Sequence, residues 1–223
     1  MAFVSPVAET DAVDKAVQAY SRIKEVLGVE EVPEVFRYMA NVPTFVHDFF
    51  MNFRKFVLSE GKLDEKTKLL IAVAVAGQAG CQAWISYLKE FAEDKSTTQQ
   101  ELTDALAVGS TNSMYNVLFK FRDISGSEIF EGMPVGLRAH TFQGTSLDER
   151  TVELINLALS DINACKPCTS AHVAKVRQLD LSDEAIYEAI RQLDLSDEAI
   201  YEAIQCAATM ISGTQFLRSI GVA

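Results

Sequence analysis

The sequence is poor in the residues that interrupt helices. Of its 223 residues, only five are proline and eleven are glycine. Proline breaks the hydrogen bonding of a helix interior and glycine weakens it, so their scarcity favours long helices over many short strands and turns. Apolar residues make up 48% of the chain, enough to bury a substantial core. The composition therefore predicts an ordered, all-α protein and excludes a disordered one.

Basic residues are also in short supply. Twenty Lys and Arg stand against 31 Asp and Glu, which gives a formal net charge of −11. Nucleic acids and anionic membranes bind clustered cations, so neither is expected as a partner. The chain has no apolar run of the roughly 18 residues that a transmembrane helix needs. Its first six residues lack the basic and apolar regions of a signal peptide, so we expect a cytoplasmic protein.

Cysteine is too rare for the disulfide framework of a secreted scaffold. The four cysteines stand at positions 81, 165, 168 and 206, and only Cys165 and Cys168 are close in sequence. In a cytoplasmic chain, such a pair is more often catalytic or metal-binding than structural. Cys81 and Cys206 are expected to be inert core residues.

What the chain does contain is helical periodicity along most of its length. Apolar residues recur every three or four positions over Ala12–Leu27, and Gly28 ends the pattern. Val35–Met39 and Thr44–Leu58 predict two further helices. Asp64–Gly80 is apolar on most faces, which predicts a helix buried in the core.

A faint internal repeat divides the chain into two related halves. Leu63–Thr67 reads LDEKT and Leu147–Thr151 reads LDERT, at an offset of 84 residues. The same offset aligns Leu69 with Glu153, Cys81 with Cys165, Trp84 with Cys168, and Leu88 with His172. The first half thus has apolar residues where the second has Glu153, Cys168 and His172, and its one cysteine has no partner nearby in the sequence. We therefore predict a single domain over 1–223, with N-terminal helices at 1–62, a degenerate repeat at 63–118 and a catalytic repeat at 147–217.

A second repeat is identical in both copies. Residues 177–190 read RQLDLSDEAIYEAI, and residues 191–204 repeat this without a change. Beyond it, the faint repeat continues at an offset of 98, from Thr111 to Thr209, so the fourteen extra residues are a tandem duplication within an otherwise complete fold. Because the second copy runs directly into the apolar pattern of Gln205–Leu217, we predict that the first copy is the displaced one.

The chemically distinctive segment is Cys165-Lys166-Pro167-Cys168, between an apolar helix and the start of another. A helix N-terminus stabilises a thiolate and lowers the thiol pKa. His172 follows Cys168 by four residues, which puts both on one helical face. Glu153 lies among apolar residues of the preceding helix, and a buried carboxylate needs a partner such as His172. A zinc site and a pair of inert core cysteines are the alternatives.

Glu153 followed by Cys165-x-x-Cys168-x-x-x-His172 resembles the signature of the AhpD-like alkylhydroperoxidases of the carboxymuconolactone decarboxylase superfamily. The similarity runs from about residue 30 to the end. It implies an AhpD-like helical fold, in which longer members resemble fused pairs, and a homo-oligomer, either a trimer or a hexamer. One departure is that Lys166 and Pro167 stand where members related to the founding enzyme have a histidine.

The resemblance also implies roles for these residues. Cys168 would attack a peroxide substrate, Cys165 would resolve the product to a disulfide, and an external dithiol or disulfide reductase would restore both. His172 and Glu153 would form the proton relay, and no cofactor or metal is implied. Two other functions stay open: a decarboxylase-type lyase acting on a lactone, which would not need the cysteine pair, and a non-enzymatic redox sensor.

Overall fold

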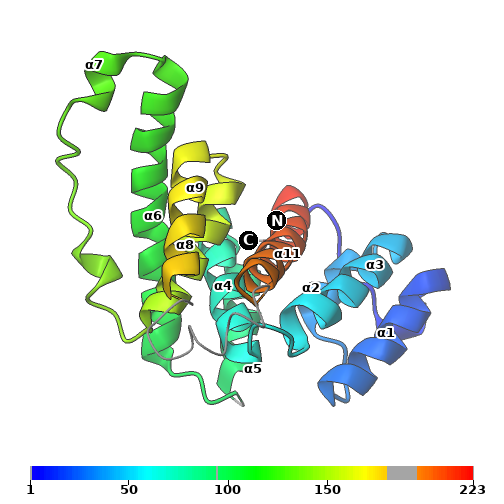
Figure 1. Ribbon diagram of the computed structural model, residues 1–223. Coiled ribbons are helices and arrows are strands. Elements are labelled where there is room, and N and C mark those ends of the chain that lie inside the picture. Colours follow the sequence, from blue (N-terminus) through cyan, green and yellow to red (C-terminus); the bar gives the residue numbers. More distant parts are fainter. Residues whose placement is uncertain (1, 94, 180–194, 223) are drawn as a thin grey trace.

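The computed structural model describes residues 2–93, 95–179 and 195–222. In these ranges all regular secondary structure is helical and there is no strand (Figure 1), which confirms the all-α prediction. Most of the first copy of the identical repeat, residues 180–190, and the start of the second, 191–194, lie outside the described residues. The displacement of the first copy therefore stays a prediction.

Helices near the N-terminus form where the periodicity predicts them. They are η1 (Glu9–Asp11), α1 (Asp14–Leu27), α2 (Glu34–Met39), α3 (Pro43–Phe53) and η2 (Arg54–Leu58). Gly28 ends α1 in the left-handed conformation, with a φ of 68°. The helix predicted over Thr44–Leu58 forms as α3 followed by η2, and η2 is π-helical. The backbone N–H and the hydroxyl of Ser59 both donate to the Arg54 carbonyl, at 3.0 and 2.8 Å, and this stabilises the wider turn.

Helix α4 (Glu65–Ala79) is the centre of the fold. It begins where the Asp64 carboxylate accepts a hydrogen bond of 2.7 Å from the Thr67 backbone N–H, and it ends at Gly80, with a φ of 65°. Every side chain of Leu69–Ala76 is buried. The helix contacts α5 (Gln82–Glu93), α6 (Gln99–Ser125), α8 (Glu149–Ile162) and α11 (Leu195–Ser219). A helix covered on all faces matches the continuous apolar pattern of its sequence.

The second half begins in the same way. At the start of α8, the Asp148 carboxylate accepts from the Thr151 backbone N–H at 2.9 Å, as Asp64 does from Thr67 at the start of α4. Both Leu-Asp-Glu segments therefore act as helix N-caps. Helix α9 (Lys166–Leu179) follows α8 and packs against both α8 and α6.

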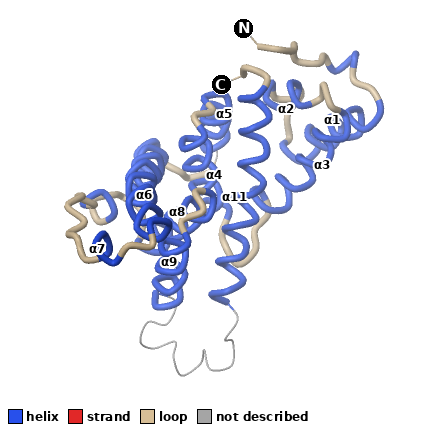
Figure 2. Tube along the Cα trace, turned by 90° about the horizontal axis from the view of Figure 1, so that it is seen from above, coloured by secondary structure: helices blue, strands red, loops and turns tan. Residues whose placement is uncertain are grey.

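The helices are arranged on two sides of the α4 and α11 pair. Figures 1 and 2 show α1, α2 and α3 on one side, and α6, α8 and α9 on the other. Helix α7 (Glu128–Glu131) lies beyond the far end of the long helix α6. The linker that follows, residues 132–148, returns beside α6 and includes the short segment η3 (His140–Phe142). This return matters for the site, because it brings Phe142 back to α6.

Residues of the second duplicated copy begin α11. Near its start, Glu202 accepts hydrogen bonds of 2.9 Å from the backbone N–H groups of Lys62 and Leu63, and its carboxylate lies 3.1 Å from the Lys68 ammonium. Arg177 in the last turn of α9 forms a 2.7 Å ion pair with Asp197 in the first turn of α11. The neighbouring ends of α9 and α11 are thus joined by a direct contact.

Candidate active site

The Cys-Lys-Pro-Cys segment lies at a sharp turn between α8 and α9. Ala164 adopts a φ of 51°, in the left-handed region that non-glycine residues seldom occupy. The turn is closed by a 3.0 Å hydrogen bond from the Cys165 backbone N–H to the Ser160 carbonyl. The sulfurs of Cys165 and Cys168 form a disulfide, with their Cα atoms 5.3 Å apart. Cys165 is fully buried, whereas Cys168 keeps 6% of its surface exposed.

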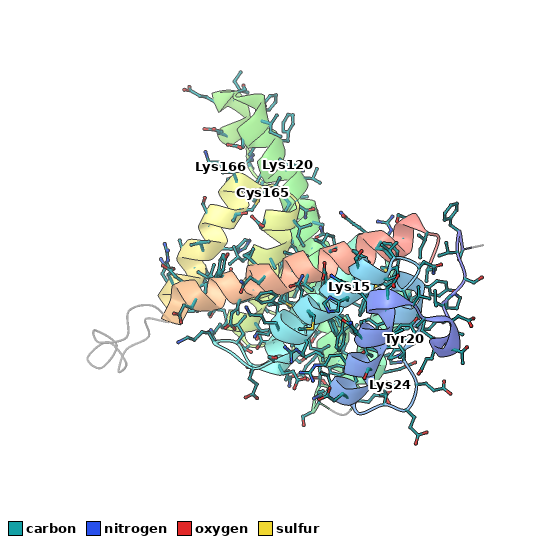
Figure 3. All side chains as sticks on the ribbon, turned by 90° about the vertical axis from the view of Figure 1, so that its right-hand side faces the viewer. Lys15, Tyr20, Lys24, Lys120, Cys165 and Lys166 are labelled. Atoms are coloured by element: carbon teal, nitrogen blue, oxygen red, sulfur yellow. A yellow bond between two sulfur atoms is a disulfide. The ribbon has the colours of Figure 1, made fainter. Side chains whose placement is uncertain are left out.

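Asn163, immediately before this turn, is fixed from three sides. Its side-chain Nδ2 donates to Asn116 Oδ1 at 2.8 Å, and its Oδ1 accepts from Gln78 Nε2 at 2.9 Å. The Lys120 ammonium donates to its backbone carbonyl at 3.0 Å. Figure 3 shows Lys120, Cys165 and Lys166 gathered in one region, far from the labelled residues of α1. Helices α4 and α6 therefore both hold the turn that presents the cysteines.

His172 on α9 meets Glu153 on α8 directly. Their Nδ1 and Oε2 atoms are 2.7 Å apart, and the two side chains are only 19% and 14% exposed. When Nδ1–H donates to the carboxylate, the other ring nitrogen, Nε2, is left to accept or donate a proton. The four residues predicted from the sequence thus belong to two packed helices and to the turn between them.

Cys168 and His172 also face a common cavity of about 270 Å³. The rest of its lining comes from α6, the linker and α9: Asn112, Tyr115, Asn116, Phe119, Phe142, Pro167 and Ala171. This cavity was not predicted from the sequence. The sequence signal that could have indicated this cavity is a spacing of four residues on α6. Asn112 and Asn116 are four residues apart, as are Tyr115 and Phe119, so each pair shares a helical face.

The remaining cysteines do not belong to the site. Cys81 and Cys206 are buried and unpaired. Burial raises the pKa of the Cys81 thiol and raises that of Cys206 to about 12. In the ranges that the structure describes, no group of three or more His, Cys, Asp and Glu side chains is arranged to hold a metal ion.

An all-α fold that presents a cysteine pair beside a histidine–carboxylate contact defines a class of helical thiol protein. Comparison with known families is more specific. The family model described as "Carboxymuconolactone decarboxylase family" matches residues 46–116 and 130–208, more than half of the chain. The chain belongs to this family, as the signature around Cys165 and Cys168 predicted.

Two similar proteins carry the same name. The chain is 32% identical over 158 residues to "Alkyl hydroperoxide reductase AhpD" of Solibacter usitatus (strain Ellin6076), covering 70% of this chain and 88% of that protein. It is 29% identical over 149 residues to the protein of that name from Koribacter versatilis (strain Ellin345), covering 67% and 76%. These similarities indicate an alkylhydroperoxidase-like protein. None of the helices described here is long and apolar enough to cross a membrane.

Proposed function

We propose that this protein is a thiol-dependent peroxidase that reduces hydroperoxides through a disulfide cycle at Cys165 and Cys168. One observation carries the proposal: the less buried of the two bonded cysteines, Cys168, shares a cavity with His172, whose ring is held by Glu153. A substrate in that cavity reaches a sulfur and a proton carrier together. The names of the similar proteins point the same way.

In the first step, the Cys168 thiolate attacks the terminal oxygen of the hydroperoxide. The S–O bond forms as the O–O bond breaks, which oxidises Cys168 to a sulfenic acid and releases the substrate as an alkoxide. His172 supplies a proton to that oxygen, so an alcohol leaves. Glu153 is the positioning residue that holds Nδ1 of the ring, and the start of α9 favours the thiolate.

In the second step, the thiol of Cys165 attacks the sulfenic sulfur of Cys168. The S–S bond forms and the oxygen leaves as water, which gives the disulfide present in the structure. An external dithiol then reduces the disulfide by thiol–disulfide exchange and is itself oxidised. The cycle consumes one hydroperoxide and one dithiol and needs no bound cofactor.

Steady-state consumption of cumene hydroperoxide with excess dithiothreitol tests the proposal. Wild-type protein should show catalytic turnover, Cys168→Ser should show none, and Cys165→Ser should lose the disulfide route. Cys206→Ser is the matched control, because Cys206 is buried away from the cavity, and it should keep wild-type turnover.

Three results would overturn the proposal. Unchanged peroxide consumption in Cys168→Ser would remove the cysteine from the mechanism. Conversion of a lactone by Cys168→Ser, with no peroxide turnover by the wild type, would identify the protein as a decarboxylase-type lyase instead. Tight zinc retained by the reduced cysteines would also contradict the cycle, because zinc-bound thiolates are not free to form the disulfide.

A further inference from the structure

The cavity beside Cys168 has an aromatic wall, formed by residues of α6 and of the linker. Tyr115 and Phe119 of α6 stack with ring centroids 6.0 Å apart, and the Phe142 ring lies 6.0 Å from that of Tyr115. All three residues line the cavity. A hydroperoxide whose oxygens lie at Cys168 therefore has its organic substituent beside these aromatic rings.

This wall is fixed in place by polar contacts outside the cavity. The Tyr115 hydroxyl donates to the Leu137 carbonyl of the linker at 2.8 Å. Farther along the linker, the backbone N–H and hydroxyl of Ser146 both donate to the Asp104 carboxylate at 2.7 Å. Burial tends to raise the pKa of Asp104, but these hydrogen bonds outweigh it and lower the pKa below its usual value. The linker that carries Phe142 is thus attached to α6 on both sides of that residue.

The Asn112 and Asn116 side chains, which line the cavity, already have hydrogen-bond partners within the protein. Asn112 Nδ2 donates to the Asn156 carbonyl at 3.1 Å, and Asn116 Nδ2 donates to Ser160 Oγ at 3.0 Å. Asn116 Oδ1 accepts from Asn163 Nδ2 at 2.8 Å. A small polar peroxide would therefore gain few new hydrogen bonds there, whereas an apolar substituent would leave water for contact with the aromatic rings.

The internal repeat places a second, equivalent position in the fold, which allows a comparison. At the offset of 98 residues, Tyr115 corresponds to Gly213, and at the offset of 84, Cys168 corresponds to Trp84. A Cβ atom on Gly213 would lie 2.5 Å from the ring of Phe49, and the Phe49 and Trp84 rings are 5.5 Å apart. Aromatic side chains of the protein itself fill the space there. The corresponding space, between Tyr115 of the degenerate repeat and Cys168 of the catalytic repeat, stays open beside the sulfur.

We propose that Tyr115, Phe119 and Phe142 make the site selective for hydroperoxides with a compact apolar body, such as a phenyl or tertiary alkyl group. This inference rests on the proposed peroxidase function. A cavity of about 270 Å³ lies just below the range of roughly 300–1,000 Å³ that encloses drug-sized ligands, so it has room for a compact substituent of this kind. Hydrogen peroxide leaves the wall without a partner, and a long-chain lipid hydroperoxide exceeds the cavity.

The test compares kcat/KM for cumene hydroperoxide, hydrogen peroxide and linoleic acid hydroperoxide at saturating dithiothreitol. The wild type should prefer cumene hydroperoxide to both others. Phe142→Ala should lose about ten- to a hundredfold in kcat/KM for cumene hydroperoxide, the effect of removing one ring contact of this size. Its kcat/KM for hydrogen peroxide should fall by a smaller factor than its kcat/KM for cumene hydroperoxide, because hydrogen peroxide does not reach the ring.

Two further variants separate specificity from folding. Phe3→Ala is the matched control, since Phe3 is also a phenylalanine, is 85% exposed and does not line the cavity. Tyr115→Phe keeps the ring but removes the hydrogen bond to Leu137, and it should raise KM for cumene hydroperoxide while kcat stays near the wild-type value. The alcohol product, 2-phenyl-2-propanol, should inhibit the wild type competitively and Phe142→Ala more weakly.

The outcomes separate this inference from the function on which it rests. If the wild type consumes none of the three peroxides, the peroxidase function fails and the selectivity fails with it. If it consumes them with equal kcat/KM, or if Phe142→Ala slows all three alike, the peroxidase stands and the aromatic wall does not set specificity. Weak, equal inhibition of both proteins by the alcohol would contradict the wall in the same way.

Discussion

Glu153 and Glu149 are carboxylates on the same helix with different surroundings. Glu153 is 14% exposed and lies 2.7 Å from His172, whereas Glu149 is 59% exposed and pairs with Lys175. If the first holds the proton-carrying ring, Glu153→Gln should lower kcat/KM for peroxide by about a hundredfold, within the range for acid–base groups. Steady-state kinetics check this, with Glu149→Gln as the control, which should change the rate less than about twofold. Equal effects of the two substitutions would remove Glu153 from the mechanism.

The cysteines should differ in reactivity for reasons of burial alone. In the reduced, folded protein, Cys168 should react with iodoacetamide first, because it lines the cavity. Cys206 should not react, since burial raises its pKa to about 12 and leaves almost no thiolate at neutral pH. Peptide mass spectrometry after timed alkylation measures both. Labelling of Cys206 as fast as Cys168 in folded protein would contradict the burial described here.

At this scale the sequence predicted which residues the structure brings together and missed the pocket beside them. Cys165, Cys168 and His172 are close along one helix start, so their spacing alone places them together. Glu153 required only the preceding helix to pack against α9. Phe142 could not be predicted, because it reaches the cavity through a long linker whose path depends on contacts with α6 such as Tyr115 to Leu137.

At the scale of elements, the start of α11 is attached to the segment before α4 through Glu202. Its partner Lys68 is only 3% exposed, so losing the carboxylate leaves a buried ammonium without its ion pair. Glu202→Gln should lower the free energy of unfolding by about 2–4 kcal/mol at neutral pH. Urea denaturation measures this. Glu198→Gln is the control on the same helix, because its pair with Lys62 is exposed, and it should cost less than about 1 kcal/mol.

The same carboxylate predicts a pH dependence. Burial tends to raise the pKa of Glu202, but hydrogen bonds from the Lys62 and Leu63 backbone and from Lys68 outweigh it, so the folded-state pKa is lowered. Its contribution to stability is therefore present above the unfolded pKa of about 4.3 and is lost as the pH falls through the folded value. Denaturation between pH 7 and pH 3 should show a smaller acid loss in Glu202→Gln than in the wild type. Parallel curves would contradict this assignment.

Most helices could be predicted, and their departures from the prediction have local causes. Apolar periodicity and the caps at Gly28, Asp64 and Gly80 are encoded within a few residues, so α1 and α4 match closely. The π-helical turn of η2 depends on Ser59 bonding back to Arg54, which periodicity does not reveal. Helix formation was thus predictable, but the course of the linker and the irregular turn were not.

For the whole molecule, the duplication raises the question of which residues the fold needs. Arg177 at the end of α9 and Asp197 at the start of α11 are in contact, so these helix ends lie near each other. Deleting residues 180–193 restores a single copy and should leave a folded, active protein. Thermal unfolding and peroxide turnover check this. An insoluble or inactive deletion protein would show that the fold depends on both copies.

Self-association is a second prediction at this scale. The outer side of α6 exposes apolar residues at helical spacing, with Val117 69%, Phe121 50% and Ile124 75% exposed. We expect this face to be covered in a trimer or hexamer. Light scattering should show that Val117→Glu with Ile124→Glu dissociates the oligomer, whereas Val17→Glu, at an exposed site on α1, leaves it intact. A wild-type monomer would contradict the expectation.

The central claim is that peroxide oxidises Cys168 and that Cys165 resolves the product. It is tested most directly by intact-protein mass spectrometry after reduced protein receives one equivalent of cumene hydroperoxide. The wild type should lose the mass of two hydrogen atoms, with the new bond mapped to Cys165 and Cys168. Cys165→Ser should gain the mass of one oxygen atom at Cys168, and Cys168→Ser should stay unchanged. Oxidation of Cys168→Ser at the wild-type rate, or a wild type that remains reduced, would contradict it.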